Sequence, residues 1–208
     1  GSTGKKSEKD PWTEDNFVDL YVVEHSVDGR FETPRRLNKS LNSNYHEGPV
    51  SFTKAGDVMY FTRSDYVKRR RGFDDRRNTQ LKIYRAEWME DEWKMGEALS
   101  FNDRMFSSCH PALSTDGNTM YFASDRPGGY GGMDLYASSK EGTNWGTPEN
   151  LGPGINTAGN EVFPFVHASG DLYFSSDLRV GIGGLDIFRS KMVDNRWTEP
   201  KNIGAPIN

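Results

Sequence analysis

The sequence has little cysteine, no excess of basic residues and no long apolar run, and each shortage excludes a class of protein. Its one cysteine, Cys109, cannot form an internal disulfide. Lys and Arg number 26 against 30 Asp and Glu, and the net charge of −4 is unlike the basic footprint of a nucleic-acid-binding protein. No apolar run approaches the roughly 20 residues that span a bilayer. We therefore expect neither a nucleic-acid partner nor a transmembrane segment.

The start of the chain is polar. Residues 1–15 are mostly Gly, Ser, Lys, Glu and Asp with one tryptophan, Trp12, a composition that predicts a flexible arm. The chain opens on Gly1 instead of methionine, which we expect of a segment cut from a longer protein, so a missing signal peptide leaves the compartment open. Residues 16–208 are expected to form one domain.

Aromatic residues make up 12% of the chain, and no segment shows sustained helical periodicity. Two short strands joined by a glycine-rich turn recur instead. Tyr121 and Tyr173 are 52 positions apart, as are Tyr136 and Phe188, whereas Tyr60 precedes Tyr121 by 61 positions. The extra residues fall in one loop, residues 66–79. A fixed period with insertions confined to one loop indicates a repeat architecture.

Each repeat contains four short strands. A proline strand (residues 47–52, 109–114 and 162–166) leads through a glycine turn to a Tyr-Phe strand, then to a third strand and a hairpin with a central aromatic. The hairpin aromatics are Phe31, Trp93, Trp145 and Trp197. Such units predict an all-β fold, a β-propeller or partial propeller of four-stranded antiparallel blades. About three and a half blades are visible, the half-blade lying at residues 17–37.

A family resemblance follows from these motifs. Residues 110–117 (HPALSTDG), running into 120–125 (MYFASD), resemble the WD40-like PD40 repeat of TolB-type propellers. The companions 127–129 (PGG), 150–152 (NLG), 155–157 (INT), 159–161 (GNE) and 183–188 (GGLDIF) are similar to the propeller of Bacteroidetes envelope proteins. Those proteins join tetratricopeptide repeats, this propeller and an OmpA-like peptidoglycan-binding domain, and include the PorE-like group linked to type IX secretion.

The resemblance implies a scaffold, periplasmic and associated with the outer membrane, some members being lipoproteins. We expect it to be non-catalytic, because everything repeated is structural and no unique residues form a set of nucleophile, base and orienting group. Its partners would be other envelope proteins, and peptidoglycan would be bound only through a domain that these residues do not include. We expect no cofactor.

One pair of neighbours suggests nucleophilic catalysis. Cys109 beside His110 could form an activated thiolate. However, neighbours on a strand point to opposite faces. Counting back from the proline, Cys109 also matches Glu47 and Val162, so we expect a small cysteine that is buried or on the channel side.

Carboxylates carry the competing interpretation. Asp19, Asp134 and Asp186 recur at the start of the third strand, with Lys82 in the odd repeat, and a residue that recurs with the fold is expected to cap a turn. The alternative function is a glycan-active or glycan-binding propeller, resembling a glycoside hydrolase or sialidase, that uses channel carboxylates. Its candidates are Glu47, Glu161 and Asp171. A peptide or small ligand in the axial channel is a third possibility.

No metal site is predicted. The four histidines (His25, His46, His110 and His167) lack ligand spacing. Asp125 with the 128–132 loop could hold calcium, but one carboxylate favours a plain turn. Residues 139–145 are only faintly similar to the sialidase Asp-box.

The most individual feature is the inserted loop. It carries the basic run Lys68, Arg69, Arg70 and Arg71, followed by Asp74 and Asp75. Long loops on rigid scaffolds concentrate binding residues. A basic run is usually a solvated loop, and Asp74 and Asp75 partly neutralise this one. The competing hypothesis is that these four basic residues contact an acidic partner or an anionic envelope polymer.

Overall fold

The computed structural model describes residues 17–67, 70–75 and 78–208 and shows strands and turns without an α-helix in those ranges. Three antiparallel sheets follow one another along the chain, and we call them blades A, B and C. Blade A contains β3 (Glu47–Phe52), β4 (Val58–Ser64), β7 (Leu81–Met89) and β8 (Glu92–Ala98). The predicted all-β fold of four-stranded antiparallel blades is confirmed.

Blades B and C repeat this order. Blade B contains β9 (Ser108–Leu113), β10 (Thr119–Ser124), β11 (Asp134–Glu141), β12 (Asn144–Trp145) and β13 (Glu149–Asn150). Blade C contains β14 (Glu161–Val166), β15 (Leu172–Ser176), β16 (Asp186–Ser190) and β19 (Lys201–Asn202), with a small hairpin of β17 (Met192–Val193) and β18 (Arg196–Trp197).

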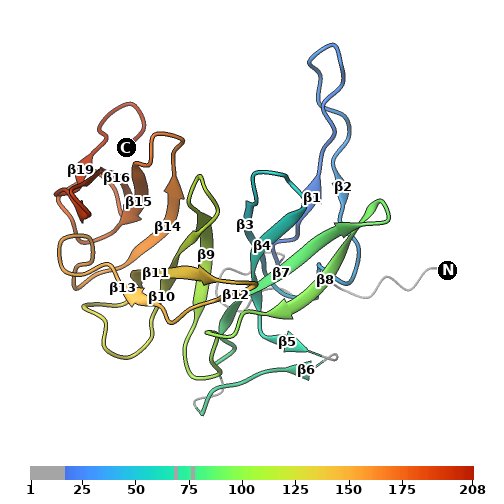
Figure 1. Cartoon of the computed structure of the whole chain (residues 1–208), viewed down its shortest axis with the longest axis horizontal. Helices are drawn as coiled ribbons and strands as arrows, with labels where there is room; N and C mark the ends of the chain where they lie inside the picture. The colour runs from blue at the N-terminus through green and yellow to red at the C-terminus, as the bar shows by residue number, and fades with distance from the viewer. Residues whose placement is uncertain (1–16, 68–69, 76–77) are drawn as a thin grey trace.

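The blades are arranged side by side around a common centre (Figure 1). Their first strands face this centre, and β9 lies between β3 and β14 and contacts both. The half-blade precedes blade A and contains β1 (Tyr21–Val22), β2 (Arg35–Arg36) and a bridge between His25 and Phe31. The chain thus forms an arc of a propeller.

The prolines of the inner strands sit in irregular pairing. The ladder between each inner strand and its neighbour is interrupted around Pro49, Pro111 and Pro164, so the missing N–H groups remove no ladder bond there. Gly48, His110 and Phe163 have φ of +106°, +56° and +52° at these bulges.

This register corrects one sequence alignment. Glu47 lies opposite Arg63, as Ser108 lies opposite Ser124 and Glu161 opposite Ser176. Glu47 is therefore equivalent to Glu161 and not to Cys109, because the proline of blade A stands one residue nearer the start of its strand. Counting back from the proline was wrong for blade A, while Cys109 does match Val162.

The fourth strand differs between blades. In blade A, β8 has seven residues and no proline. In blades B and C the strand breaks where Pro148 and Pro200 stand, leaving short pieces such as β12 and β13. Side-chain bonds span the breaks: Ser138 Oγ donates to Gly146 O at 2.7 Å, and Ser190 Oγ to Thr198 O at 2.5 Å.

The core consists of apolar layers between blades. One layer joins Tyr60 and Ile83 of blade A to Phe122 and Trp145 of blade B. A second joins blades B and C, and a third packs blade A against the half-blade. No helix in the described part of the chain is long and apolar enough to cross a membrane.

Candidate functional site

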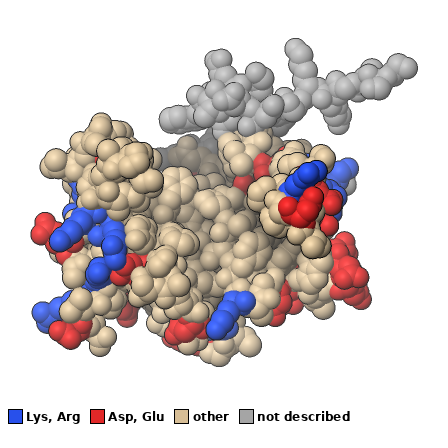
Figure 2. Space-filling view, turned by 90° about the horizontal axis from the view of Figure 1, so that it is seen from above, with Lys and Arg blue, Asp and Glu red and all other residues tan. Residues whose placement is uncertain are grey.

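The inner strands form an open groove at the centre of the arc. It has a volume of about 580 Å³ and is lined on its three sides by side chains that include Phe52, Leu113, Pro111, Pro164 and Phe165. Its lining carries one charged residue, Lys54. Seen from above, the middle of the molecule is correspondingly free of charged residues, which gather toward the edges (Figure 2). This axial groove is one of the concave surfaces that the described residues offer to a ligand.

Cys109 and His110 do not form a catalytic pair. Cys109 is fully buried, and burial raises the pKa of its thiol to about 12. His110 stacks on Phe163 with ring centroids 3.9 Å apart, and its Nδ1 accepts the Phe163 N–H at 3.3 Å. Burial lowers the pKa of His110 to about 4. Of the two places expected for Cys109, buried or on the channel side, the structure shows the buried one.

Asp134 and Asp186 cap the glycine-rich turns, as predicted. The Asp134 carboxylate accepts the N–H groups of Tyr130 and Gly131 at 2.6 and 3.2 Å. Asp186 accepts the corresponding groups of Ile182 and Gly183. Both aspartates are almost fully buried, so their oxygens belong to the fold.

In the half-blade and in blade A, the residue at the position of Asp134 and Asp186 has a different role. Asp19 is not a turn cap: it accepts two bonds from the Arg36 guanidinium, at 2.7 and 2.5 Å. Lys82 in blade A pairs with Asp65 at 2.7 Å, so the carboxylate comes from the preceding strand end. The loop of blade A, which is longer than those of blades B and C, therefore has no aspartate cap.

The carboxylates named for the glycan-active alternative are engaged inside the protein. Glu161 accepts bonds from Thr157 N, Thr157 Oγ1 and Ser176 Oγ at 2.6–2.8 Å. Glu47 accepts a bond from Ser43 Oγ and lies 3.5 Å from Arg63 Nε, and burial raises its pKa. Both glutamates are at most 1% exposed.

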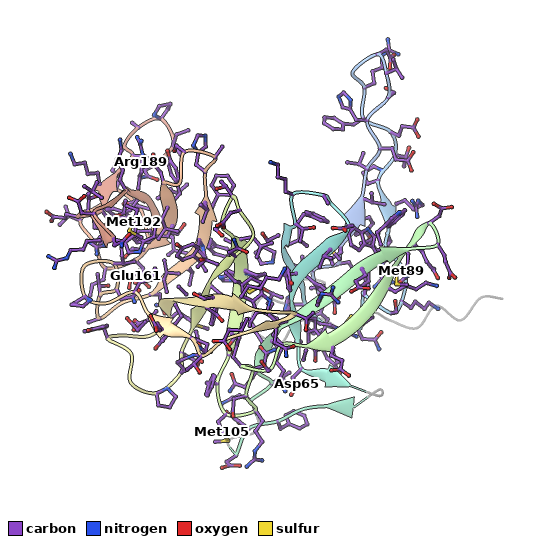
Figure 3. All side chains as sticks on the ribbon, viewed as in Figure 1. Asp65, Met89, Met105, Glu161, Arg189 and Met192 are labelled. Carbon is purple, nitrogen blue, oxygen red and sulfur yellow. The ribbon has the colours of Figure 1, made fainter. Side chains whose placement is uncertain are left out.

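Asp171 belongs to a different environment. It pairs with Arg189, whose hydrogen bond lowers the pKa of the carboxyl group. Figure 3 shows Glu161 and Arg189 on blade C, away from Asp65 at the foot of blade A. The structure therefore brings none of these acids together as a free pair on the axial groove.

Sequence reasoning missed an asparagine in every repeat. In each, the side-chain amide bonds both the backbone N–H and the C=O of one residue in the third-strand segment, with distances of 2.7–3.0 Å. The four pairs are Asn42 with Leu20, Asn102 with Ile83, Asn156 with Leu135 and Asn208 with Ile187. The signal available was their spacing of 52 residues between Asn156 and Asn208.

Arginines that cover third-strand rings were also missed. Arg63 lies 5.7 Å from the ring centroid of Tyr84, Arg126 4.9 Å from that of Tyr136, and Arg179 5.9 Å from that of Phe188. They come from different positions of the repeat, so no spacing reveals them. Each contact combines cation–π attraction with shielding of the blade edge.

The candidate calcium loop is held by protein groups. Asp125 Oδ1 accepts the Ser107 N–H at 2.7 Å, and the equivalent Asp177 accepts the N–H of Asn160 at 2.7 Å. Among the described residues, no three His, Cys, Asp or Glu side chains gather as metal ligands.

The basic loop is described in part. Lys68 and Arg69 lie outside the described residues, as does the predicted arm at 1–15. Arg70 and Arg71 form β6, which pairs with β5 (Tyr66–Val67) as a hairpin. Asp75 of the same loop pairs with Arg104 at 3.3 Å.

Comparison with solved structures shows the propeller fold. TolB from Acinetobacter baumannii matches with a TM-score of 0.52 and 13% identity over 89% of this chain and 38% of that one. A putative TolB from Agrobacterium tumefaciens gives 0.50 and 16%, over 88% and 60%. A puromycin-hydrolyzing peptidase of Mycobacterium tuberculosis gives 0.52 and 14%, over 83% and 24%.

The chain spans less than two thirds of each of these three proteins. No protein-family model matches the sequence, and no curated protein sequence matches it. The similar structures include both TolB and a hydrolase. The likeness therefore establishes the fold, and the activity must be argued from the residues.

Proposed function

We propose that this chain is a non-catalytic protein-interaction scaffold, a propeller segment of a periplasmic, outer-membrane-associated bacterial envelope protein. The observation that carries the proposal is the use of the polar side chains. The repeated aspartates, the two buried glutamates and the Cys109–His110 pair are all engaged in internal bonds or burial. What the inner strands leave to a ligand is an apolar groove.

The compartment follows from the resemblance of the repeat motifs to Bacteroidetes envelope propellers. The TolB-like fold is consistent with that assignment. Partners would be other envelope proteins, and type IX secretion is the process that the resemblance suggests.

Site-specific crosslinking tests the proposal. A photoreactive amino acid in place of Phe52 or Leu113 would report contacts of the axial groove in cells of the source bacterium. The matched control is the same substitution at Met89, which is 51% exposed at the outer end of β7. We expect specific crosslinks to envelope proteins from the groove positions and none from Met89, in the periplasmic or outer-membrane fraction.

Two results would contradict the scaffold proposal. One is crosslinking only to cytoplasmic proteins. The other is hydrolysis of a glycan by the purified protein that Glu161→Gln abolishes while the variant keeps its circular dichroism spectrum.

The basic loop is a second proposed contact surface. Changing Arg69, Arg70 and Arg71 together to alanine should weaken binding of an acidic partner at low salt and leave it unchanged at high salt, because exposed charges are screened there. Binding that is unchanged at low salt would remove the loop from the proposal.

A further inference from the structure

Neighbouring blades contact each other through the same tyrosine position. Trp145 of blade B packs edge-on against Tyr60 of blade A, with ring centroids 5.6 Å apart and planes at 79°. Trp197 of blade C packs against Tyr121 of blade B in the same way, at 5.8 Å and 74°. Each tryptophan comes from the peripheral hairpin of the following blade. The same tyrosine–tryptophan contact therefore joins blade A to blade B and blade B to blade C.

Blade C carries the third tyrosine of this series. Tyr173 lies opposite Arg189, at the register where Tyr60 lies opposite Arg85 and Tyr121 opposite Ala137. Among the described residues, the aromatic contacts of Tyr173 are with Phe165 and His167 of its own blade. The receiving position is present, while the following blade's aromatic is not in the described chain.

The surroundings of Tyr173 match the covered faces of the other blades. Ile83 and Leu135 are fully buried under the next blade. Their equivalent, Ile187, lies in an open cleft of about 330 Å³ together with Phe165, Tyr173 and Ile203. Phe165 is 57% exposed, whereas the equivalent Ala112 is 5% exposed. We call this surface the Tyr173 face. The side chains of this surface are mostly apolar, as they are at protein–protein interfaces.

The asparagine that ends each repeat also fixes where the following segment of chain would start. Asn102 and Asn156 fix the linkers that lead from blade A to B and from B to C. Asn208 makes the same two bonds to Ile187. A polypeptide joined after Asn208 would begin where Thr157 begins after Asn156.

We propose that the Tyr173 face is a docking surface for a β-blade of the same repeat, which places an aromatic side chain of its peripheral hairpin on Tyr173. The two internal blade contacts indicate this occupant, because each places an aromatic ring of the following blade on the equivalent tyrosine. A second copy of the chain is the rival, because its half-blade exposes Phe31, which is 73% exposed and stands at the tryptophan position.

An in-phase fusion tests the proposal. A second copy of residues 157–208 is joined after Asn208, which continues the 52-residue spacing between Asn156 and Asn208. Ile187→Cys in the parent blade C reports coverage through its rate of alkylation by iodoacetamide, since Cys109 is fully buried. The matched control is Val180→Cys, which is 95% exposed.

We expect the fusion to slow alkylation at position 187 at least tenfold relative to the 208-residue chain, and to leave position 180 unchanged. Alanine in place of the added copy of Trp197 should restore most of the rate, as should Tyr173→Ala in the parent blade. Equal rates in the fusion and the parent, with the parent's circular dichroism spectrum preserved, would overturn the proposal. So would protection in the parent chain that rises with concentration alongside dimer formation in light scattering, because a second copy would then be the occupant.

Discussion

At the scale of single residues, the fold depends on polar side chains that bond the backbone. Each asparagine amide satisfies one N–H of a third-strand segment and gives a second donor to the C=O of the same residue, which also accepts a backbone N–H. In an individual loop such an asparagine is an ordinary turn residue, so composition and turn preference could not identify it. Only superposing all four repeats reveals its role.

Asn156→Ala should therefore destabilise the protein strongly. It leaves the N–H of Leu135 unpaired in a buried position, at a cost of about 1–3 kcal/mol, whereas the C=O of Leu135 keeps the Leu151 N–H at 3.0 Å. The measurement is the free energy of unfolding in urea. Asn144→Ala, at an exposed site on β12, is the control and should stay within about 0.5 kcal/mol of the wild type. Equal effects of the two variants would contradict the assigned role.

His110 predicts a dependence of stability on pH. Burial lowers its pKa from 6.5 to about 4, so the folded state resists protonation more than the unfolded chain does. The stability is fully present above pH 6.5 and is lost as pH falls from 6.5 toward 4. The loss should reach on the order of 2 kcal/mol by pH 5.

His110→Asn is the matched variant, because asparagine tolerates the positive φ of this position. Its free energy of unfolding should change less between pH 7 and pH 5 than that of the wild type. Parallel pH profiles of the two proteins would assign the effect to other groups.

At the scale of elements, most strands could be predicted because they alternate aromatic and small residues between glycine turns. The inner strands at 47–52, 109–114 and 162–166 were predicted within one residue of β3, β9 and β14. The equivalence of Glu47 could not be predicted by counting from a proline, since a bulge shifts that proline relative to the ladder.

The loop of blade A shows how an element tolerates insertion. Blades B and C close their turns with an aspartate that holds loop N–H groups, which fixes the loop length. Blade A replaces this cap with the Asp65–Lys82 pair, formed between strand ends. The pair holds the stem of the loop and leaves its length free. The replacement was visible in the sequence, but its partner was not.

Lys82→Ala should cost about 2–3 kcal/mol, because it leaves Asp65, which is 7% exposed, without its counter-charge. The same change in an Asp65→Asn background should cost at least about 1 kcal/mol less. Urea unfolding of the four proteins gives this coupling energy, and Lys140→Ala is an exposed control. A coupling energy near zero would show that the two side chains act independently.

At the scale of the whole molecule, stability lies between blades more than within them. Each layer of the core joins two neighbours, and a single blade would expose both of its faces. Repeat proteins of this kind behave as a chain of units coupled through nearest-neighbour interfaces. The sequence predicts the units from their period. It does not predict how strongly each interface couples them, since that depends on the fit of particular rings.

Trp145 tests this coupling directly. It is 6% exposed and fills the layer between blades A and B against Tyr60, so Trp145→Ala should cost about 3–5 kcal/mol through lost contacts and a cavity. The loss falls on one interface, and blade A should then unfold at lower urea concentration than blades B and C. Hydrogen exchange should show β4 and β7 losing protection before β15 and β16.

Trp88→Ala is the matched control, because Trp88 is 47% exposed and its aromatic contact is with Trp93 of its own blade. Since that contact crosses no blade interface, the control should lower the stability of blade A slightly and preserve a single transition. A single transition in Trp145→Ala, with uniform exchange across the three blades, would instead mean that the arc folds as one unit.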